Sequence, residues 1–312
     1  MRNILVTGGT GFLGSNICKY LVKAGYKVSV FDNNFRGKIS RLESIKKEIA
    51  FFRGDIQKKK DLKKAIKKID TVIHLAYING TKFFYERPIE VLNVGVKGIF
   101  NILEICKDYN VKNFFLASSS EVYQTPQKIP TDENEMLKVP NVYNPRYSYG
   151  VGKIISEMLC IYYAKKIFKK LVIFRPHNVY GPDMGKEHVI PQFIEKILKT
   201  KYKNFIKIKG KGKEIRSFIY INDFMQAFDL IFRKGKNLEI YNIGTSERIS
   251  IKKLAIKIIK KINKKIKIKE GDSFLGNTNI RCPDISKIIK LGFRQNVKLD
   301  DGLNLILNKL KI

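Results

Sequence analysis

A glycine-rich turn close to the start of the chain constrains its fold more than any other feature. Gly8, Gly11 and Gly14 follow an apolar run at residues 3–7 and precede the stretch GSNICKYLVKAG, whose apolar spacing is helical. Glycine is required where such a strand–helix turn is tight and where the backbone must touch a pyrophosphate. The helix N-terminus offers free N–H groups and a positive dipole end to that anion. The turn therefore predicts a dinucleotide site at the first strand–helix junction.

A carboxylate at the end of the second predicted strand indicates which dinucleotide binds. The run KVSVFD ends at Asp32, close to the spacing of about 20 residues that separates the glycines from the ribose-binding acid in this motif. A carboxylate there accepts hydrogen bonds from the adenosine ribose hydroxyls and repels a 2′-phosphate. We therefore expect the cofactor to be NAD rather than NADP.

Strands and helices alternate along the first half of the chain. Further apolar runs are typical of buried parallel strands, and helical stretches separate them. This rhythm predicts an α/β fold of the Rossmann type, in which helices cover both faces of a doubly wound parallel sheet. The runs are IAFFRGD, DTVIHLAY, KNFFLASSS and LVIFRP, and the helical stretches lie near 58–68, 89–110 and 147–168.

The rhythm changes after residue 176, where a turn-rich loop and an amphipathic helix are followed by NFIKIKGKGKEIRSFIYI, which suggests strand, turn and strand. We expect residues 1–176, with roughly 214–240, to form the dinucleotide-binding domain. Residues 177–213 and 241–312 should form a smaller α/β domain for the substrate. No segment between them has the composition of a flexible linker, so the two parts should pack closely.

Two polar patterns predict the reaction centre. Tyr149 and Lys153 are four residues apart on a predicted helix, so they share one face. An ammonium beside a phenol stabilises the phenolate, which lets a tyrosine act as a base near neutral pH. The second pattern is the polar segment at 118–121 (SSSE), which ends a predicted strand on the side of the sheet where doubly wound folds bind ligands, although by itself it is more simply explained as a polar turn.

The excess of basic residues suggests a polyanionic partner, but the distribution of these residues along the chain does not. Lys and Arg number 61 against 28 Asp and Glu, which gives a formal net charge of +33. Such a charge makes nucleic acid or an anionic membrane a natural suspicion. The lysines are spread over predicted helix faces instead of forming a tail, which is what a compositional bias produces. A non-catalytic nucleic-acid-binding protein stays an alternative, but it would not need Tyr149 and Lys153, so we expect no nucleic-acid partner.

The cysteines and the hydropathy place the protein in a reducing, aqueous compartment. The four cysteines are isolated and show no metal-ligand or redox spacing, so we expect neither a metal site nor disulfides. No window reaches the length of a membrane span, and the N-terminal run breaks into glycines too soon for a signal peptide. We therefore expect a cytoplasmic protein without a membrane partner.

Seven motifs stand in a fixed order along the chain: TGGTGFLG, the strand-end Asp32, GDI at 54–56, HLA at 74–76, the SSSEVY segment, YxxxK, and RPxNVYGP at 175–182. In this order they resemble the extended short-chain dehydrogenases/reductases of the NAD-dependent epimerase/dehydratase family. The resemblance covers essentially all 312 residues. It implies an enzyme that binds NAD tightly and oxidises a nucleotide-diphosphate sugar, usually at carbon 4. It also implies a homodimer or homotetramer formed through helices near 93–108 and 149–168.

The resemblance also assigns the chemical roles. Tyr149 should remove the hydroxyl proton, Lys153 should bind the nicotinamide ribose and lower the pKa of Tyr149, and Ser119 should hydrogen-bond the reacting oxygen. Glu121 matches a glutamate that some dehydratases and decarboxylases carry, so it is a possible catalytic residue. His74 is expected to be a packed strand residue.

Binding residues follow from the same motifs. On the substrate side they are Ser119, Ser120 and Asn178 near the sugar, with Arg216 and Arg281 at the diphosphate, where guanidinium groups suit phosphate oxygens. On the cofactor side they are Gly8, Gly11, Phe12, Leu13, Gly14, Asp32, Asn33, Asp55, Ile56, Leu75, Ala76 and Asn93, together with Tyr149 and Lys153.

The resemblance leaves the fate of the 4-keto sugar open between epimerisation, 4,6-dehydration, decarboxylation and simple release. Ser120 departs from the Asp-Glu pair of one dehydratase group, and Gln124 replaces the usual Gly after VY, which weighs against elimination. Longer stretches, such as INGTKFFYERPIEVLNVGVKG and FRPHNVYGPDMGKEHVIPQF, resemble a subgroup from bacterial polysaccharide clusters that oxidises GDP-manno-heptose at carbon 4 for capsular heptoses. We therefore expect a GDP-linked substrate and a 4-keto product, with 4-epimerase or 4,6-dehydratase as the alternative.

Overall fold

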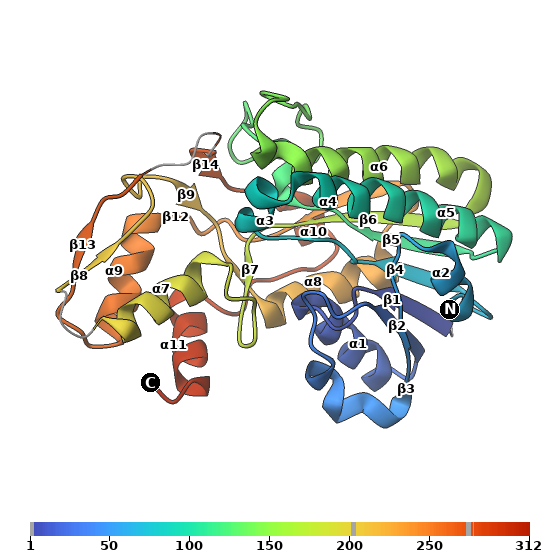
Figure 1. Ribbon diagram of the computed structural model, residues 1–312, viewed down its shortest axis with the longest axis horizontal. Coiled ribbons are helices and arrows are strands. Elements are labelled where there is room, and N and C mark those ends of the chain that lie inside the picture. Colours follow the sequence, from blue (N-terminus) through green and yellow to red (C-terminus); the bar gives the residue numbers. More distant parts are fainter. Residues whose placement is uncertain (1–2, 201–203, 273–275, 277) are drawn as a thin grey trace.

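The structure is a computed structural model that describes residues 3–200, 204–272, 276 and 278–312. A seven-stranded sheet forms the centre of its larger part (Figure 1). The strand order is β11-β6-β5-β4-β1-β2-β3, and all neighbours are parallel. The strands are β1 (Asn3–Thr7), β2 (Lys27–Asp32), β3 (Ile49–Arg53), β4 (Thr71–His74), β5 (Asn113–Ala117), β6 (Lys170–Pro176) and β11 (Glu239–Ile243). The predicted Rossmann-type sheet is confirmed.

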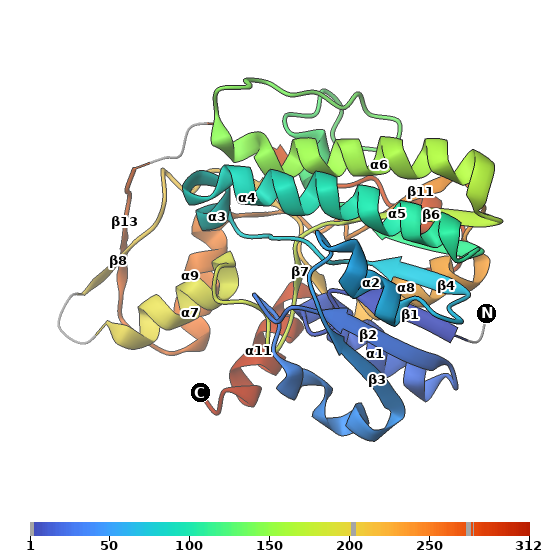
Figure 2. The ribbon, with the colours of Figure 1, turned by 45° about the vertical axis from the view of Figure 1, so that its right-hand side comes forward.

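The sheet is buried because helices cover both of its faces (Figure 2). Alternate side chains of β1 join different cores: Ile4 and Val6 pack with α1 and α8, whereas Leu5 packs with α2, α5 and α6. The helices of these layers are α1 (Phe12–Lys23) and α8 (Ile221–Lys234) on one face. On the other are α2 (Lys59–Ala65), α4 (Pro88–Leu92), the π-helical η2 (Asn93–Lys97), α5 (Gly98–Asp108) and α6 (Ser148–Ile167).

The smaller part lies beyond the carboxyl ends of the strands, at the left of Figure 1. Short strands from distant segments build it: β8 pairs with β13 in parallel, and β9 lies between β12 and β14. Its elements are β7 (Val179–Tyr180), α7 (Val189–Lys199), β8 (Phe205–Lys207), β9 (Ile215–Arg216), β10 (Ile219–Tyr220), β12 (Ile249–Ser250), α9 (Ile251–Lys261), β13 (Lys267–Lys269), β14 (Ile280–Arg281) and α11 (Leu299–Lys309). Helix α10 (Ser286–Ile289) follows β14 in the chain but packs on β11 and α8 of the larger part.

The chain passes between the two parts more than once. After β8 and β9 it returns through α8 and β11 to the edge of the large sheet, which therefore extends past the boundary expected near 240. The remaining connections include η1 (Ile39–Glu48), α3 (Thr81–Glu86), η3 (Ser120–Tyr123) and η4 (Pro145–Tyr147).

The sequence predicted neither a membrane-spanning segment nor a metal site, and the described part of the chain can be inspected for both. None of its helices combines the length and the apolar character that a membrane crossing requires. Its His, Cys, Asp and Glu side chains form no group of three or more that could hold a metal ion. All four cysteines are buried free thiols.

Candidate active site

The glycine turn forms a cradle that side chains would fill. Gly8 has a φ of 72°, and a Cβ on it would lie 2.7 Å from the Ala76 nitrogen. A Cβ on Gly14 would lie 2.2 Å from the Gly8 carbonyl oxygen. Gly11 caps α1 without a side-chain acceptor, so the first N–H groups of the helix stay available. These features fit the pyrophosphate of a dinucleotide.

Asp32 stands at the carboxyl end of β2, beside this cradle. Its Oδ2 accepts a hydrogen bond from the Thr10 N–H at 3.0 Å, and its Oδ1 accepts one from the Asn34 N–H at 2.8 Å. Each carboxylate oxygen keeps a further lone pair that a ribose hydroxyl can use. The carboxylate therefore both fixes the turn and offers acceptors to a ligand.

A hollow of about 180 Å³ begins at this carboxylate and contains most of the predicted cofactor residues. Asn93 is exposed on η2, and its neighbours Glu90 and Val94 line the hollow. Phe12, Leu13 and Gly14 line an adjoining, larger hollow. The predicted residues lining the first hollow are Gly8, Gly11, Asp32, Asn33, Asp55, Ile56, Leu75 and Ala76.

The larger hollow, of about 480 Å³, runs from the sheet edge to the smaller part of the molecule. The two hollows share the glycine turn, Arg36, Leu75 and Tyr77. The larger hollow contains the predicted catalytic and substrate residues Ser119, Ser120, Glu121, Tyr149, Lys153, Asn178, Arg216 and Arg281. The two predicted ligand sites therefore meet, as a reaction between two ligands requires.

Helix α6 brings Tyr149 and Lys153, both buried, into the larger hollow, where they lie against the shared residue Tyr77. The Lys153 Nζ donates to the Ala117 carbonyl oxygen at the end of β5, at 2.6 Å. The Tyr149 hydroxyl shares a hydrogen bond with Ser119, and Phe84 stacks on the Tyr149 ring with centroids 4.9 Å apart. The structure thus assembles the three predicted catalytic side chains.

Burial governs the electrostatics of this pair. It raises the pKa of Tyr149 above its usual range, which the Ser119 hydrogen bond and the charge of Arg36 partly offset. Burial lowers the pKa of Lys153 to about 7, against the charge of Glu157. We expected Lys153 to lower the pKa of Tyr149. In this arrangement the Lys153 ammonium is directed at the Ala117 carbonyl oxygen, and burial of the phenol prevails.

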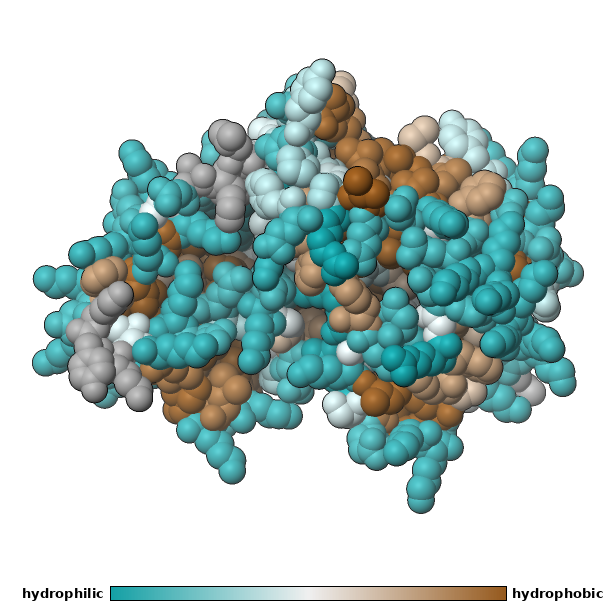
Figure 3. Space-filling view, viewed as in Figure 1, coloured by the Kyte–Doolittle hydropathy of each residue, from teal (hydrophilic) through white to brown (hydrophobic). Residues whose placement is uncertain are grey.

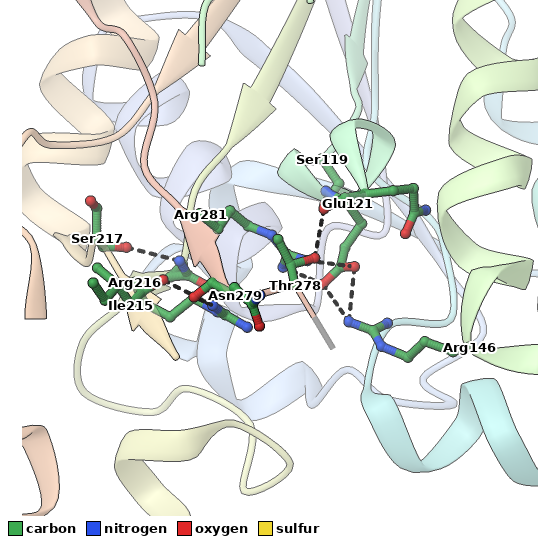
Figure 4. Close-up of polar contacts among 11 residues, drawn as sticks. Ser119, Glu121, Arg146, Ile215, Arg216, Ser217, Thr278, Asn279 and Arg281 are labelled. Carbon is green, nitrogen blue, oxygen red and sulfur yellow. Dashed lines mark hydrogen bonds and ion pairs between the residues drawn. The ribbon is translucent and has the colours of Figure 1, made fainter. Parts of the chain in front are cut away.

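Glu121 is held between two arginines, as Figure 4 shows. Arg146 Nη2 donates to both carboxylate oxygens, at 3.0 and 2.9 Å. Arg281 donates from Nη1 at 2.5 Å and from Nη2 at 3.1 Å. Burial would raise the pKa of Glu121, but the charges of Arg281 and Arg146 hold it at about 2. In this arrangement the two arginines hold Glu121 in its ionised form at neutral pH.

Arg216 is the cation of this cluster that forms no ion pair within the described residues. Its Nη1 donates to the Ile215 carbonyl oxygen at 2.9 Å. Burial and the charge of Arg281 lower the pKa of Arg216 to about 9. Asn178, with a φ of 41°, lies nearby and donates from Nδ2 to the Ser217 carbonyl oxygen at 2.8 Å. Arg216 therefore marks a place where an anion would be stabilised.

His74 is a packed strand residue, as expected. It is buried on β4, and its Nδ1 lies 2.8 Å from the Thr7 hydroxyl. Burial lowers the pKa of His74 to about 3, so the ring is neutral. It lines neither hollow.

Three site residues escaped the sequence interpretation. Arg146 pairs with Glu121, Arg36 lines both hollows, and Tyr77 lies against Lys153. Each stands next to a recognised motif: three residues before Tyr149, four after Asp32, or directly after HLA. That adjacency was the available signal.

Comparison with known proteins decides the family. The model of the NAD dependent epimerase/dehydratase family matches residues 4–244. The chain belongs to this family. Within the described residues, the glycine cradle and the Asp32 acceptors fit a dinucleotide, and NAD is the cofactor that the family uses.

Relatives in the family perform different reactions. The chain is 34% identical over 271 residues to a dTDP-D-glucose 4,6-dehydratase of Dictyostelium discoideum. The aligned region covers 83% of this chain but only 62% of that protein. It is 32% identical to a UDP-N-acetyl-alpha-D-glucosaminuronate decarboxylase of Bacillus cytotoxicus, over 97% of this chain and 95% of the relative. A solved UDP-glucose 4-epimerase of Thermotoga maritima superposes with a TM-score of 0.88 at 28% identity, covering 99% of both chains.

Proposed function

We propose that this enzyme uses bound NAD to oxidise a nucleoside-diphosphate sugar at carbon 4. The observation that carries the proposal is the contact of Tyr149 with Ser119 in the larger hollow, beside Tyr77, which lines both hollows. NAD, when bound, supplies the hydride acceptor. Residues 1–176 and the returning segment through β11 would hold NAD, and the smaller part would hold the nucleotide sugar. The four buried free thiols suit a reducing compartment such as the cytoplasm.

Tyr149 and its neighbours would handle the proton. Burial raises the pKa of the Tyr149 phenol, so the positive charges of Lys153 and of bound NAD would have to stabilise the phenolate that takes the proton of the sugar hydroxyl. Ser119 hydrogen-bonds the same oxygen and keeps it in reach of the phenol. Lys153, one helical turn away, binds the nicotinamide ribose and places a positive charge where negative charge develops. Asp32 binds the adenosine ribose and disfavours NADP.

The cationic end of the larger hollow would bind the diphosphate. Arg216 has no counter-ion within the described part of the chain, and its burial makes an anionic ligand favourable. Arg281 lies beside it but is engaged with Glu121, so we assign it a supporting role. Ser120 and Asn178 line the same hollow, where Ser120 would contact the sugar and Asn178 the sugar diphosphate.

The serine at position 120 favours 4-epimerisation among the possible outcomes. Elimination of water needs a group that protonates the leaving hydroxyl, and Ser120 stands where one dehydratase group carries an acid. Epimerisation needs only the removal and return of hydrogen at carbon 4. The Thermotoga maritima structure, which matches this chain along 99% of its length, is of a 4-epimerase.

Release of the 4-keto sugar is the second candidate, with GDP-manno-heptose as substrate in capsular polysaccharide synthesis. It rests on the resemblance of segments such as 78–98 and 174–193 to the subgroup that carries out this oxidation. It needs no acid at Glu121 either, so it is compatible with the same arginine cage.

Product analysis separates these outcomes. The purified enzyme is incubated with UDP-glucose, dTDP-glucose or GDP-manno-heptose, and the products are identified by mass spectrometry and NMR. Epimerisation gives a product of unchanged mass with inverted carbon 4. Dehydration removes one water, and release of the ketone removes two hydrogens and reduces the NAD. Absence of any product from all three nucleotide sugars would contradict the proposal.

A further inference from the structure

Tyr77 lies beside the two side chains that are proposed to handle the proton. It lies three residues after the end of β4, and its ring meets the Tyr149 ring edge-on with centroids 4.9 Å apart. The Lys153 Nζ lies 4.2 Å from the centre of the Tyr77 ring but 5.8 Å from that of Tyr149. At 4.2 Å an ammonium over an aromatic face is stabilised as a cation. The nearer aromatic partner of Lys153 is therefore Tyr77.

Two glycines form a slot that fixes the Tyr77 ring. A Cβ on Gly95 would lie 1.9 Å from the Tyr77 hydroxyl oxygen, and a Cβ on Gly152 would lie 2.0 Å from it. Gly95 belongs to η2 and Gly152 to α6, so the helices on both sides lack a side chain at this point. The Tyr77 hydroxyl is buried without a hydrogen-bond partner in the described part of the chain. The slot therefore holds the ring by shape.

Apart from its hydrogen bond to the Ala117 carbonyl oxygen, at 2.6 Å, Lys153 has little other stabilisation for its charge. The acidic side chain closest along α6 is Glu157, but both of its oxygens already accept hydrogen bonds from Arg175, at 2.9 and 2.6 Å. Burial opposes the ammonium more strongly than Glu157 favours it. The titratable groups around Lys153 are Tyr149, Glu157 and Cys160 of α6, His74 of β4, Tyr77 and Arg175.

We propose that Tyr77 is a positioning residue, whose ring face keeps Lys153 charged beside the reaction centre, and whose hydroxyl takes no part. This inference rests on the proposed role of Lys153 in the nucleotide-sugar reaction. The ring and the hydroxyl of Tyr77 can be tested separately, because Tyr77→Phe keeps the ring and Tyr77→Leu removes it.

The first test compares Tyr77→Phe with Tyr77→Leu in the pH dependence of kcat. Tyr77→Phe should keep the wild-type profile. Tyr77→Leu should move the alkaline limb to lower pH by about one unit, since the ammonium loses its aromatic partner. At alkaline pH this is a loss of about tenfold, with little change at acid pH. Equal profiles for the two variants would overturn the inference, as would a shift in Tyr77→Phe.

Gly95→Ala should also separate the Tyr77 ring from Lys153, without a change to Tyr77 itself. The new methyl group would enter the slot and displace the Tyr77 ring without altering α6. We expect the alkaline limb to shift as in Tyr77→Leu while the Kd for NAD is unchanged. A weakened NAD affinity with an unshifted pH profile would overturn the inference, because Tyr77 would then be a cofactor contact.

A measurement without substrate keeps this inference distinct from the proposed function. The Lys153 Cε signal of 13C-lysine-labelled protein, assigned by its loss in Lys153→Met, reports the titration of the amine directly. Tyr77→Leu should lower the pKa of Lys153 by about one unit, and Tyr77→Phe should not. An unchanged pKa in Tyr77→Leu overturns the inference. Failure of the wild type to convert any nucleotide sugar would defeat only the proposed function.

Discussion

Glu121 accepts hydrogen bonds from both Nη atoms of Arg281, although 160 residues separate them in the chain. The pair joins η3, at the carboxyl edge of the large sheet, to β14 of the smaller part. Arg146 binds the same carboxylate from the segment that precedes α6. One buried negative charge therefore connects the catalytic helix, the sheet edge and the substrate part.

Removing the charge of Glu121 should destabilise the protein strongly. Glu121→Gln leaves two buried guanidinium groups without their carboxylate, which costs about 3 kcal/mol or more when one partner of a buried pair is lost. Urea unfolding measures the change. The control is Glu43→Gln, whose pair with Lys46 is 69% exposed on both sides and should matter by less than about 0.5 kcal/mol. Equal effects of the two substitutions would contradict the buried cage.

The stability that the ionised Glu121 contributes should depend on pH. The folded pKa of Glu121 is about 2, below its ordinary value of 4.5, so its stabilisation is complete above pH 4.5. It is lost as the pH falls through the range from 4.5 to about 2. The difference in unfolding free energy between wild type and Glu121→Gln should therefore be constant near neutrality and shrink in this acid range.

Lys153 should set a second pH dependence, of the same sign but in the alkaline range. Burial lowers its folded pKa to about 7 from 10.5, so the unfolded chain binds more protons between these values. The wild type therefore gains stability as the pH rises through this window, by up to about 1.4 kcal/mol per pH unit. Lys153→Met, which removes the buried charge, should be relatively more stable than the wild type at pH 6 than at pH 10. A difference independent of pH would contradict the buried ammonium.

The fold and the catalytic pair could be predicted because their signals are local. Buried parallel strands are short apolar runs, the glycine turn is one contiguous motif, and Tyr149 and Lys153 share a helix face by their spacing alone. Helix ends and strand ends bring such motifs to the same edge of the sheet without further information.

The remaining features depend on contacts between distant segments. The sequence suggested strand, turn and strand in the segment that contains β8 and β9, but β8 pairs with β13 some 60 residues later, and β9 pairs with β12 and β14. Glu121 was predicted as a possible catalytic group and Arg281 as a phosphate ligand. Only the folded chain shows that they neutralise each other.

Gly14 should tolerate no side chain. In Gly14→Ala the Cβ would lie 2.2 Å from the Gly8 oxygen and 2.8 Å from the Gly9 Cα, both backbone atoms that cannot turn away. We expect a loss of about 2 kcal/mol or more in stability together with weaker NAD binding, measured by calorimetry. Gly25→Ala is the matched control, because Gly25 has a φ of 82° in open space. It should cost about 1 kcal/mol and leave the NAD affinity unchanged.

The outer faces of α5 and α6 should form a homodimer interface. Figure 3 shows hydrophobic residues over α6, where Met158 and Tyr162 are exposed, and Phe100 is exposed on α5. Introducing a charge in Met158→Glu or Phe100→Glu should weaken the dimer at least tenfold, because a desolvated carboxylate at an interface is costly. Light scattering after gel filtration measures the mass, with Leu305→Glu on α11 as the control. A monomeric wild type would contradict this assignment.

The proposed reaction requires that hydrogen leaves carbon 4 of the sugar while Tyr149 takes the hydroxyl proton. The most direct test follows nucleotide sugars deuterated at carbon 4, with wild type, Tyr149→Phe and the exposed control Tyr143→Phe. We predict slower turnover with deuterium, retention of the label at carbon 4 of an epimer or its transfer to the reduced cofactor, and normal activity in Tyr143→Phe. Tyr149→Phe should bind NAD but turn over at least about 100-fold more slowly. Replacement of the label by solvent hydrogen, or an active Tyr149→Phe enzyme, would contradict the account.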